Sequence, residues 1–168
     1  TTKSLTLSSL AEGAHILTLR LVDIAWNIGV VSTATLKVTE VITAPTSLST
    51  QTLSLNTASD TGTSSTDLIT NDTTPTITTS TLANISMSIG DIIQVIDTSN
   101  SNAVVGSYTV LSTDLTSGKW NGTTKSLTLS SLAEGAHILK LRLVDLAGNI
   151  GVVSTATLTV TEDITAPT

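Results

Sequence analysis

Hydrophobic and polar residues alternate along short stretches of this chain, and the alternation predicts its main elements. In residues 15–23, Leu17, Leu19 and Leu21 fall on one side of an extended chain, and the residues between them fall on the other. A period of two is typical of a β-strand with one face toward a core and one toward water. The same pattern returns in residues 137–145, so the sequence predicts strands in both places.

The alternation along the rest of the chain predicts two groups of strands, separated by turns and one long polar loop at 60–75. The first group covers residues 4–8, 15–23 and 30–39. The second group covers residues 48–55, 76–82, 91–97, 104–111, 126–130, 137–145 and 152–161. Seven short strands joined by turns predict an all-β, immunoglobulin-like antiparallel β-sandwich. The side chains expected to point inward are Ile93, Val95, Trp120, His137, Leu139, Leu141, Leu143, Ala156, Leu158 and Val160.

The strand pattern at the start of the chain is repeated at its end, because the sequence contains a duplication. Residues 1–46 recur at 123–168, an offset of 122 residues (123 − 1), with only five differences. This period is far longer than the roughly 20–50 residues of solenoid repeats, so each repeat is expected to be a whole domain. We interpret residues 1–43 as the last three strands of one repeat, 44–165 as a complete repeat, and 166–168 as the start of the next linker. The five differences are Thr18/Lys140, Ile24/Leu146, Trp26/Gly148, Lys37/Thr159 and Val41/Asp163.

Residues 1–43 alone would expose their leucines and leave strand edges open to pairing. We therefore expect other strands to complete this segment. Because 1–46 and 123–168 are nearly identical, residues 44–122 of a neighbouring molecule are a suitable complement, as in domain swapping.

Composition narrows the functional class. Only 12% of the residues are charged, against about 25% in a typical globular chain, and the net charge is −6. An acidic balance argues against nucleic-acid binding. The sequence contains no apolar run of about 18 residues or more, so we expect no membrane-spanning segment in it. There is no cysteine, which excludes disulfides and thiolate metal sites. A threonine-rich, acidic, cysteine-free β-repeat is typical of an extracellular bacterial surface protein.

No arrangement of residues suggests an enzyme. There is no cysteine nucleophile, no serine in a Gly-x-Ser-x-Gly turn and no glycine-rich phosphate loop. Each copy has one histidine, His15 or His137, directly after Glu-Gly-Ala at a strand start. We interpret it as a strand-end histidine bonded to backbone rather than as a ligand or base.

Side-chain oxygens supply the only candidate site. Asp60, Asp67, Asn71 and Asp72 share the long loop, which the strand order places near Glu162 and Asp163 at the end of the last strand. Asp145 and Asn149 would lie at the opposite end, near the incoming linker at 40–43. Ca²⁺ takes about 6–8 oxygen ligands of these kinds. The alternative is that these Asp and Asn residues simply cap turns.

Three motifs in order resemble the bacterial immunoglobulin-like repeats of giant RTX-type or biofilm surface adhesins. They are DTGTSSTDLITNDTTP at 60–75, LAEGAH at 132–137, and VDLAGN at 144–149, ending in TAP at 165–167. The resemblance implies non-catalytic extender domains of secreted, cell-surface attachment proteins. It also implies structural Ca²⁺ near domain junctions. Val41 stands where the second copy has Asp163, so the first junction lacks one carboxylate.

We therefore expect an extender that spaces a distal binding module from the cell, in contact with neighbouring repeats of the same protein. A second hypothesis is a subunit of a self-assembling extracellular fibre or sheath, in which strands cross between molecules. A third is a carbohydrate- or ice-binding module, suggested by the outward phase of the last strand. Those outward residues are Val153, Thr155, Thr157, Thr159 and Thr161.

Overall fold

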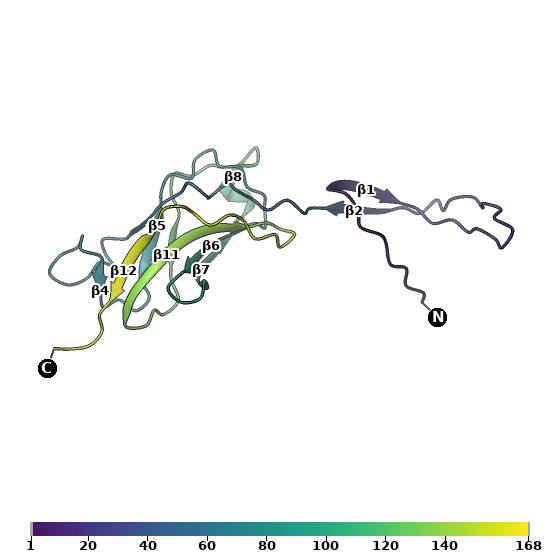
Figure 1. Ribbon diagram of the computed structural model, residues 1–168. Helices are drawn as coiled ribbons and strands as arrows, with labels where there is room; N and C mark the ends of the chain where they lie inside the picture. Colours follow the sequence, from purple (N-terminus) through teal and green to yellow (C-terminus); the bar gives the residue numbers. More distant parts are fainter. Residues whose placement is uncertain (1, 168) are drawn as a thin grey trace. The chain divides into compact units, whose positions relative to one another are not determined.

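The computed structural model describes residues 2–167, which divide into two units after Thr43 (Figure 1). Among the described residues, no helix is long and apolar enough to span a bilayer. The all-β prediction is confirmed, because the single helical segment of this range is a short 3₁₀ turn, η1 (Ser112–Asp114).

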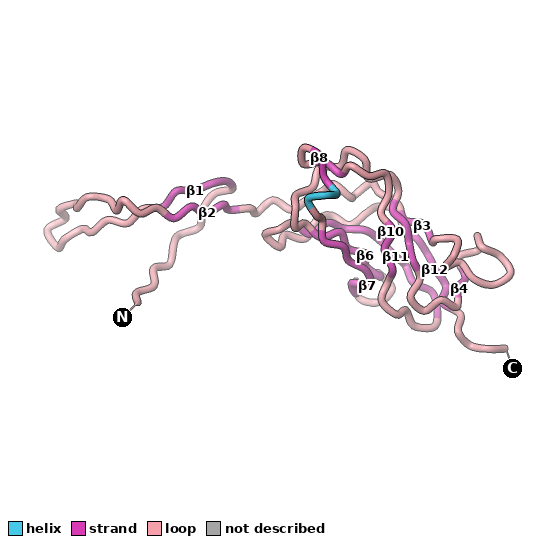
Figure 2. The backbone as a smooth tube through the Cα atoms, turned by 180° about the vertical axis from the view of Figure 1, so that it is seen from behind, coloured by secondary structure: helices cyan, strands magenta, loops and turns pink. Residues whose placement is uncertain are grey.

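The N-terminal unit is built on one antiparallel pair, β1 (Gly13–Leu17) and β2 (Leu36–Glu40). Its register runs from Gly13 opposite Glu40 to Leu17 opposite Leu36. A long excursion joins the two strands and contains an isolated bridge between Val22 and Ile28. Figure 2 shows this excursion as a narrow loop that extends beyond the paired strands.

The C-terminal unit contains two facing sheets, as in an immunoglobulin-like sandwich. One sheet has the order β10 (Ser126–Thr128), β5 (Thr76–Thr79), β3 (Leu53–Leu55). The other has the order β4 (Ile69–Thr70), β12 (Leu158–Glu162), β11 (Gly135–Val144), β6 (Ile92–Asp97), β7 (Ala103–Thr109). A small hairpin pairs β8 (Leu115–Thr116) with β9 (Lys119–Trp120).

The hydrophobic core belongs entirely to the C-terminal unit. Every buried apolar side chain among the described residues lies between Leu48 and Val160. The inward phases predicted from alternation are confirmed for β6, β11 and β12, and Trp120 is also buried. Ala156 is only half-buried. Residues 44–165 therefore hold a complete core of their own.

In the first copy, the predicted strands are too long. Residues 4–8 form no strand, the strand expected at 15–23 ends at Leu17, and the strand expected at 30–39 begins only at Leu36. The second copy shows the reason. There the second half of β11, from Leu139 to Val144, pairs with β6, and β10 pairs with β5. The N-terminal unit has no counterpart of β5 or β6, so the same residues lack the ladder that those strands provide.

Several boundaries in the C-terminal unit also differ from the prediction. Residues 47–50 form a turn, so the strand expected at 48–55 is reduced to β3. The strand expected at 152–161 is regular only from Leu158, because the preceding residues bond singly to separate backbone carbonyls. The loop at 60–75 contains the two-residue strand β4, which runs parallel to β12 and which the sequence pattern did not reveal.

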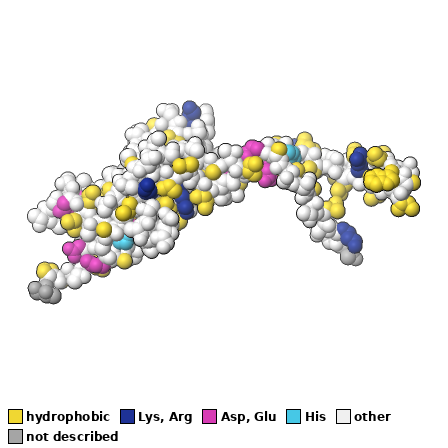
Figure 3. Space-filling view, viewed as in Figure 1, with side chains coloured by type: hydrophobic (Ala, Val, Ile, Leu, Met, Phe, Trp, Pro, Cys, Tyr) yellow, Lys and Arg dark blue, Asp and Glu magenta, His cyan; other side chains and the backbone are white. Residues whose placement is uncertain are grey.

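The N-terminal unit exposes a surface that we call the leucine face, consisting of Leu5, Leu7, Leu17, Leu19 and Leu36. It lines an open apolar hollow of about 450 Å³. Leu19 is 64% exposed, whereas its counterpart Leu141 is completely buried. Hydrophobic side chains are visible on this unit in Figure 3. The structure contains one chain, so completion of this face by a second copy stays a prediction.

Candidate functional site

The long loop and the last strand meet at one end of the sandwich, as the strand order predicts (Figure 1). In the parallel pair of β4 and β12, Glu162 lies opposite Thr70. The backbone N–H of Asp163 donates to the carbonyl of Thr70 at 2.8 Å. This end, which we call the C-terminal pole, therefore brings the loop carboxylates to the end of the chain's last strand.

Glu162 is the unusual residue at this pole. It continues the inward phase of Leu158 and Val160 in β12, and it is completely buried. Both of its carboxylate oxygens are buried without a hydrogen-bond partner. Burial and then the charges of Asp72 and Glu134 raise the pKa of Glu162, against the opposing effect of His137. A buried, unpaired carboxylate beside other carboxylates is unfavourable unless a proton or a cation neutralises it.

Asp60 is the second predicted ligand with an unused oxygen. It is buried, and its Oδ2 accepts a long hydrogen bond of 3.3 Å from the backbone N–H of Leu68. Its other carboxylate oxygen, Oδ1, is buried with no partner. Asp60 therefore keeps part of its capacity to bind a cation.

Two other predicted loop ligands, Asp67 and Asp72, cap turns, which was the alternative interpretation. Asp67 accepts from the N–H of Ile69 at 3.2 Å, and Asp72 accepts from the N–H of Thr74 at 3.2 Å. The Asx turns at Asp67 and Asp72 fix local backbone direction without any metal. Asn71 instead accepts from the hydroxyl of Thr61, ten residues earlier, at 2.8 Å. Asp163 is exposed to solvent.

Asp145 lies at the other end of the unit, where it organises a turn. Its two oxygens accept from the backbone N–H and the side-chain amide of Asn149, both at 2.8 Å. These bonds lower the pKa of Asp145. The first copy forms the same turn, with Asp23 and Asn27 at 2.9 Å. The repetition favours a structural role for Asp145.

The seven predicted metal ligands do not form one site. Within residues 2–167, no three carboxylate or imidazole groups lie close enough together to hold a metal ion. The donor chemistry nevertheless fits a hard cation at the C-terminal pole, because Glu162 and Asp60 offer buried, unpaired oxygens. Of the predicted ligands, Glu162 and Asp60 are therefore the two with unused oxygens, and a cation there would need further oxygens that lie apart in this structure.

A buried ion pair near the pole was missed in the sequence. His137 Nδ1 lies 2.7 Å from Asp97 Oδ2, and its Nε2 lies 2.8 Å from the carbonyl oxygen of Ala133. The carboxylate of Asp97 and the carbonyl of Ala133 both accept, so this geometry suits an imidazole that is protonated on both nitrogens. The predicted backbone bond of this histidine is confirmed, and the first copy repeats it between His15 and Ala11. Asp97 could have been found, because it follows Ile93 and Val95 in the inward phase of β6.

The contact between His137 and Asp97 shifts the pKa values of both side chains. Burial by itself would lower the pKa of His137, but the bonds to Asp97 and Ala133 outweigh burial and raise it. Burial would likewise raise the pKa of Asp97, but the bonds from His137 and Ser99 lower it. The pair is therefore charged on both sides over the mildly acidic range.

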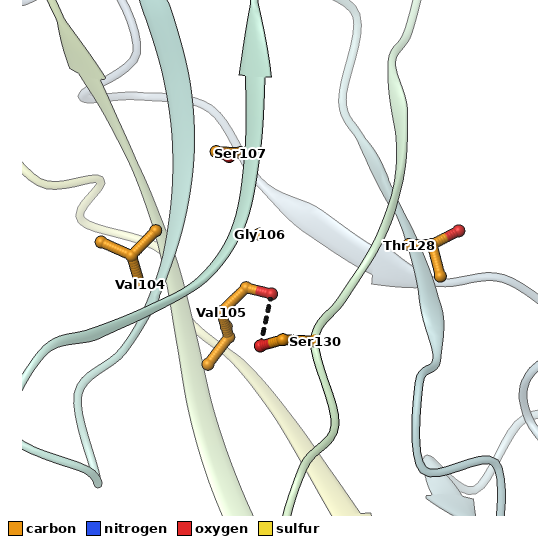
Figure 4. Close-up of a pocket in the computed structure, with 6 residues that line it drawn as sticks. All are labelled: Val104, Val105, Gly106, Ser107, Thr128 and Ser130. Carbon is orange, nitrogen blue, oxygen red and sulfur yellow. Dashed lines mark hydrogen bonds between the residues drawn. The ribbon is translucent and has the colours of Figure 1, made fainter.

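A shallow cleft of about 290 Å³ lies between β7 and the end of β10 with the residues that follow it. Figure 4 shows its lining, in which the hydroxyl of Ser130 donates to the carbonyl of Val105 at 3.1 Å. The lining consists of apolar and hydroxyl side chains, with no titratable group: Val104, Val105, Gly106, Ser107, Thr128 and Ser130. This cleft offers neither a base nor an acid for catalysis.

The family comparison agrees with this architecture. The family profile described as bacterial Ig-like domain matches residues 47–163. One similar solved structure is titled "Biofilm associated protein - BSP domain", with 17% identity and a TM-score of 0.37. The match covers 93% of this chain and 20% of that chain, so this chain spans a fifth of its length. No curated protein matches the sequence.

Proposed function

Because the chain belongs to the bacterial immunoglobulin-like domain family, we propose that residues 44–165 serve as an extender repeat of a large bacterial cell-surface adhesin. The repeat is non-catalytic and holds a distal binding module away from the cell. The observation that supports this role is the duplication in register: Gly13 pairs with Glu40 as Gly135 pairs with Glu162. The same strand pair, in the same register, thus recurs along one chain.

A unit of this kind adds length efficiently. The strand β11 has 10 residues, and at about 3.3 Å per residue it spans roughly 33 Å. Repeats joined end to end would each contribute a similar length. The composition supports an extracellular setting, because a cysteine-free, threonine-rich surface with few charges needs no reducing compartment.

Small-angle X-ray scattering tests the spacer role. Proteins of one, two and four copies of residues 44–165 in series are expected to increase in maximum dimension in proportion to copy number. The expected increment is roughly 35 Å per copy, about the length of one strand plus its turns. Dimensions that grow only as those of a compact assembly would contradict the proposal.

The leucine face favours a second candidate, a fibre subunit completed by strands of another copy. The leucines that the two halves share are all inside the core in the C-terminal unit, and the N-terminal unit leaves most of them exposed. The same scattering series, repeated at rising concentration with the full chain, separates the two candidates. Growth in mass with concentration supports a fibre, and a constant mass supports a spacer.

We also propose that Ca²⁺ binds at the C-terminal pole and stiffens the junction. Glu162 and Asp60, whose buried oxygens have no partner, would bind the ion, and Asp72 and Asp163 would have to move toward it to complete the site. When bound, the ion would supply positive charge that neutralises the buried carboxylate. The residues themselves link β12 to the loop after β3, so a cation here would tie the end of the repeat to its first loop.

Thermal unfolding of residues 44–165 with Ca²⁺ and with chelator tests this site. At a calcium concentration 100 times the dissociation constant, the folded state should gain about 2.7 kcal/mol. Glu162→Gln should remove most of this gain and should raise the midpoint in chelator, because it removes the buried charge. Asp67→Asn, which alters only a turn cap, is the matched control and should keep the calcium response. An unchanged midpoint in the parent protein would reject the metal and leave the spacer role intact.

A further inference from the structure

In each copy, one glutamate side chain binds the segment that follows the last strand. In the C-terminal unit, Glu134 Oε2 accepts the backbone N–H of Ile164 at 2.9 Å and the hydroxyl of Thr165 at 3.2 Å. We call this contact the exit clamp. It joins two segments 30 residues apart in sequence, the turn before β11 and the segment after β12. It fixes the direction in which the chain leaves the repeat.

The N-terminal unit forms the same exit clamp. There Glu12 Oε2 accepts the N–H of Ile42 at 2.8 Å, and the N–H and hydroxyl of Thr43 at 3.1 Å each. The glycine after each glutamate has a positive φ, 120° at Gly13 and 118° at Gly135. A side chain is strained in that conformation, so glycine is required where the glutamate turns toward the departing chain. The contact survives in a unit that lacks most of the sandwich, so it depends only on residues within the repeated segment.

The C-terminal unit also holds the chain that arrives at it. The carbonyl of Pro45 accepts the N–H of Val152 at 3.1 Å. A Cβ added at Gly151 would collide with the same carbonyl, and it would lie 2.5 Å from the carbonyl oxygen of Leu143. Only glycine therefore leaves room for the proline. We call the residues around Pro45 the proline cradle: Leu143, Gly151 and Val152.

These contacts leave one linker residue unheld. Thr43 is bonded in its own unit, Pro45 is bonded in its own unit, and only Ala44 lies between them. The proline ring fixes φ at Pro45, and a residue before proline is restricted to extended conformations. The backbone between the two bonded residues therefore consists of Ala44 alone.

We propose that each repeat carries two binding sites for the Ile-Thr-Ala-Pro linker, the exit clamp and the proline cradle. Together they restrict the angle between consecutive repeats without any metal. The inference rests on the proposed spacer role for its purpose, because a spacer needs stiff junctions. It differs from the calcium proposal in that the stiffening comes from a carboxylate and a glycine of the chain itself.

The test uses two copies of residues 44–165 in series, which restores the sequence Ile-Thr-Ala-Pro at the junction. Because the chain has no cysteine, one cysteine in place of the exposed Asn100 in each copy takes a spin label. Pulsed electron spin resonance then gives the distribution of distances between the labels. In chelator, the unsubstituted junction should give one narrow distribution.

Glu134→Ala in the first copy should broaden this distribution. It frees Ile164 and Thr165, so three linker residues rather than one are unheld. The span of a flexible segment grows with the square root of its length, which predicts broadening of about 1.7-fold. The same substitution in the second copy is the matched control, because that clamp holds no junction, and the width should stay unchanged.

Gly151→Ala offers an independent pair of variants. In the second copy it should broaden the distribution by displacing the proline, and in the first copy it should not. Equal widths for substitutions in either copy, or a broad distribution for the parent protein in chelator that narrows only with Ca²⁺, would overturn the inference. Either result leaves the spacer role open, because scattering measures length per repeat independently.

Discussion

Asp97→Ala is expected to lower the free energy of unfolding of the sandwich by about 3–5 kcal/mol, because removal of one partner leaves a buried charge uncompensated. Asp97 is completely buried and binds the His137 ring at 2.7 Å. Its Oδ1 also accepts the N–H of Ser99 at 3.0 Å. Denaturant unfolding near pH 6 measures the loss, with Trp120 fluorescence as the probe. The parent protein and every variant carry Trp26→Gly, so that Trp120 is the single tryptophan that fluoresces.

His15→Ala and His137→Ala form a matched pair for this prediction. Both histidines bond to a backbone carbonyl at 2.8 Å, but only His137 has a buried carboxylate partner. His137→Ala should therefore destabilise the sandwich and His15→Ala should not. A double replacement of Asp97 and His137 should be less harmful than the sum of the two single replacements, because no charge is left alone. A loss below about 1 kcal/mol for Asp97→Ala would show that the pair is not a buried charge pair.

The destabilisation by Asp97→Ala should depend on pH. The raised pKa of His137 means that its contribution is complete below about pH 6.5 and is lost as pH rises through the folded value. The lowered pKa of Asp97 means that its contribution is present above about pH 3.9 and is lost as pH falls through the folded value. The groups acting on the ring are Asp97, the Ala133 carbonyl and Glu162. The effect should thus be largest between these limits.

The second large effect is expected from Leu141→Ala, which should lower the free energy of unfolding by about 2–5 kcal/mol through the cavity that it leaves. Leu141 is completely buried in β11, between the two sheets. Leu19 occupies the same position in the first copy and is 64% exposed. Leu19→Ala should change the stability of the sandwich by less than about 0.5 kcal/mol. The same chemical change thus probes two environments in one chain.

Equal losses from the two leucine replacements would contradict the described difference in burial. That result would mean that the leucine face is covered in solution. Sedimentation of the parent chain would then show whether a second copy provides the cover. A large loss from Leu141→Ala alone agrees with the structure.

Alternation predicted the core but not the strand lengths. The inward positions of β6, β11 and β12 follow from a period of two, which is a property of the backbone itself. Where a strand ends depends on whether a partner lies beside it. Residues 4–8 and 126–130 have the same sequence, yet only the second segment pairs with β5 and contains a strand. Local sequence could not distinguish these two cases.

For the candidate site, too, the sequence predicted the position of the elements but not the contacts of each side chain. The strand order correctly placed the loop at 60–75 beside the end of β12. The identity of the residues could not show which oxygens would be used by turns, as in Asp67 and Asp145, and which would stay unpaired, as in Glu162. Glu162 could have been singled out from its phase, because it follows Leu158 and Val160 at every second position.

The duplication of the leucines of the leucine face raises the question of how residues 44–122 find their correct partner segment. Residues 44–122 can be matched by either of two nearly identical segments, 1–46 or 123–168, and none of the five differences lies among the fully buried residues. Contact energies therefore discriminate poorly between the right and the wrong half. Correct pairing therefore depends on chain connectivity and on the order in which the segments emerge during synthesis. Pairing in such an array is under kinetic control, and sequence divergence between adjacent copies would allow contact energies to select the correct partner.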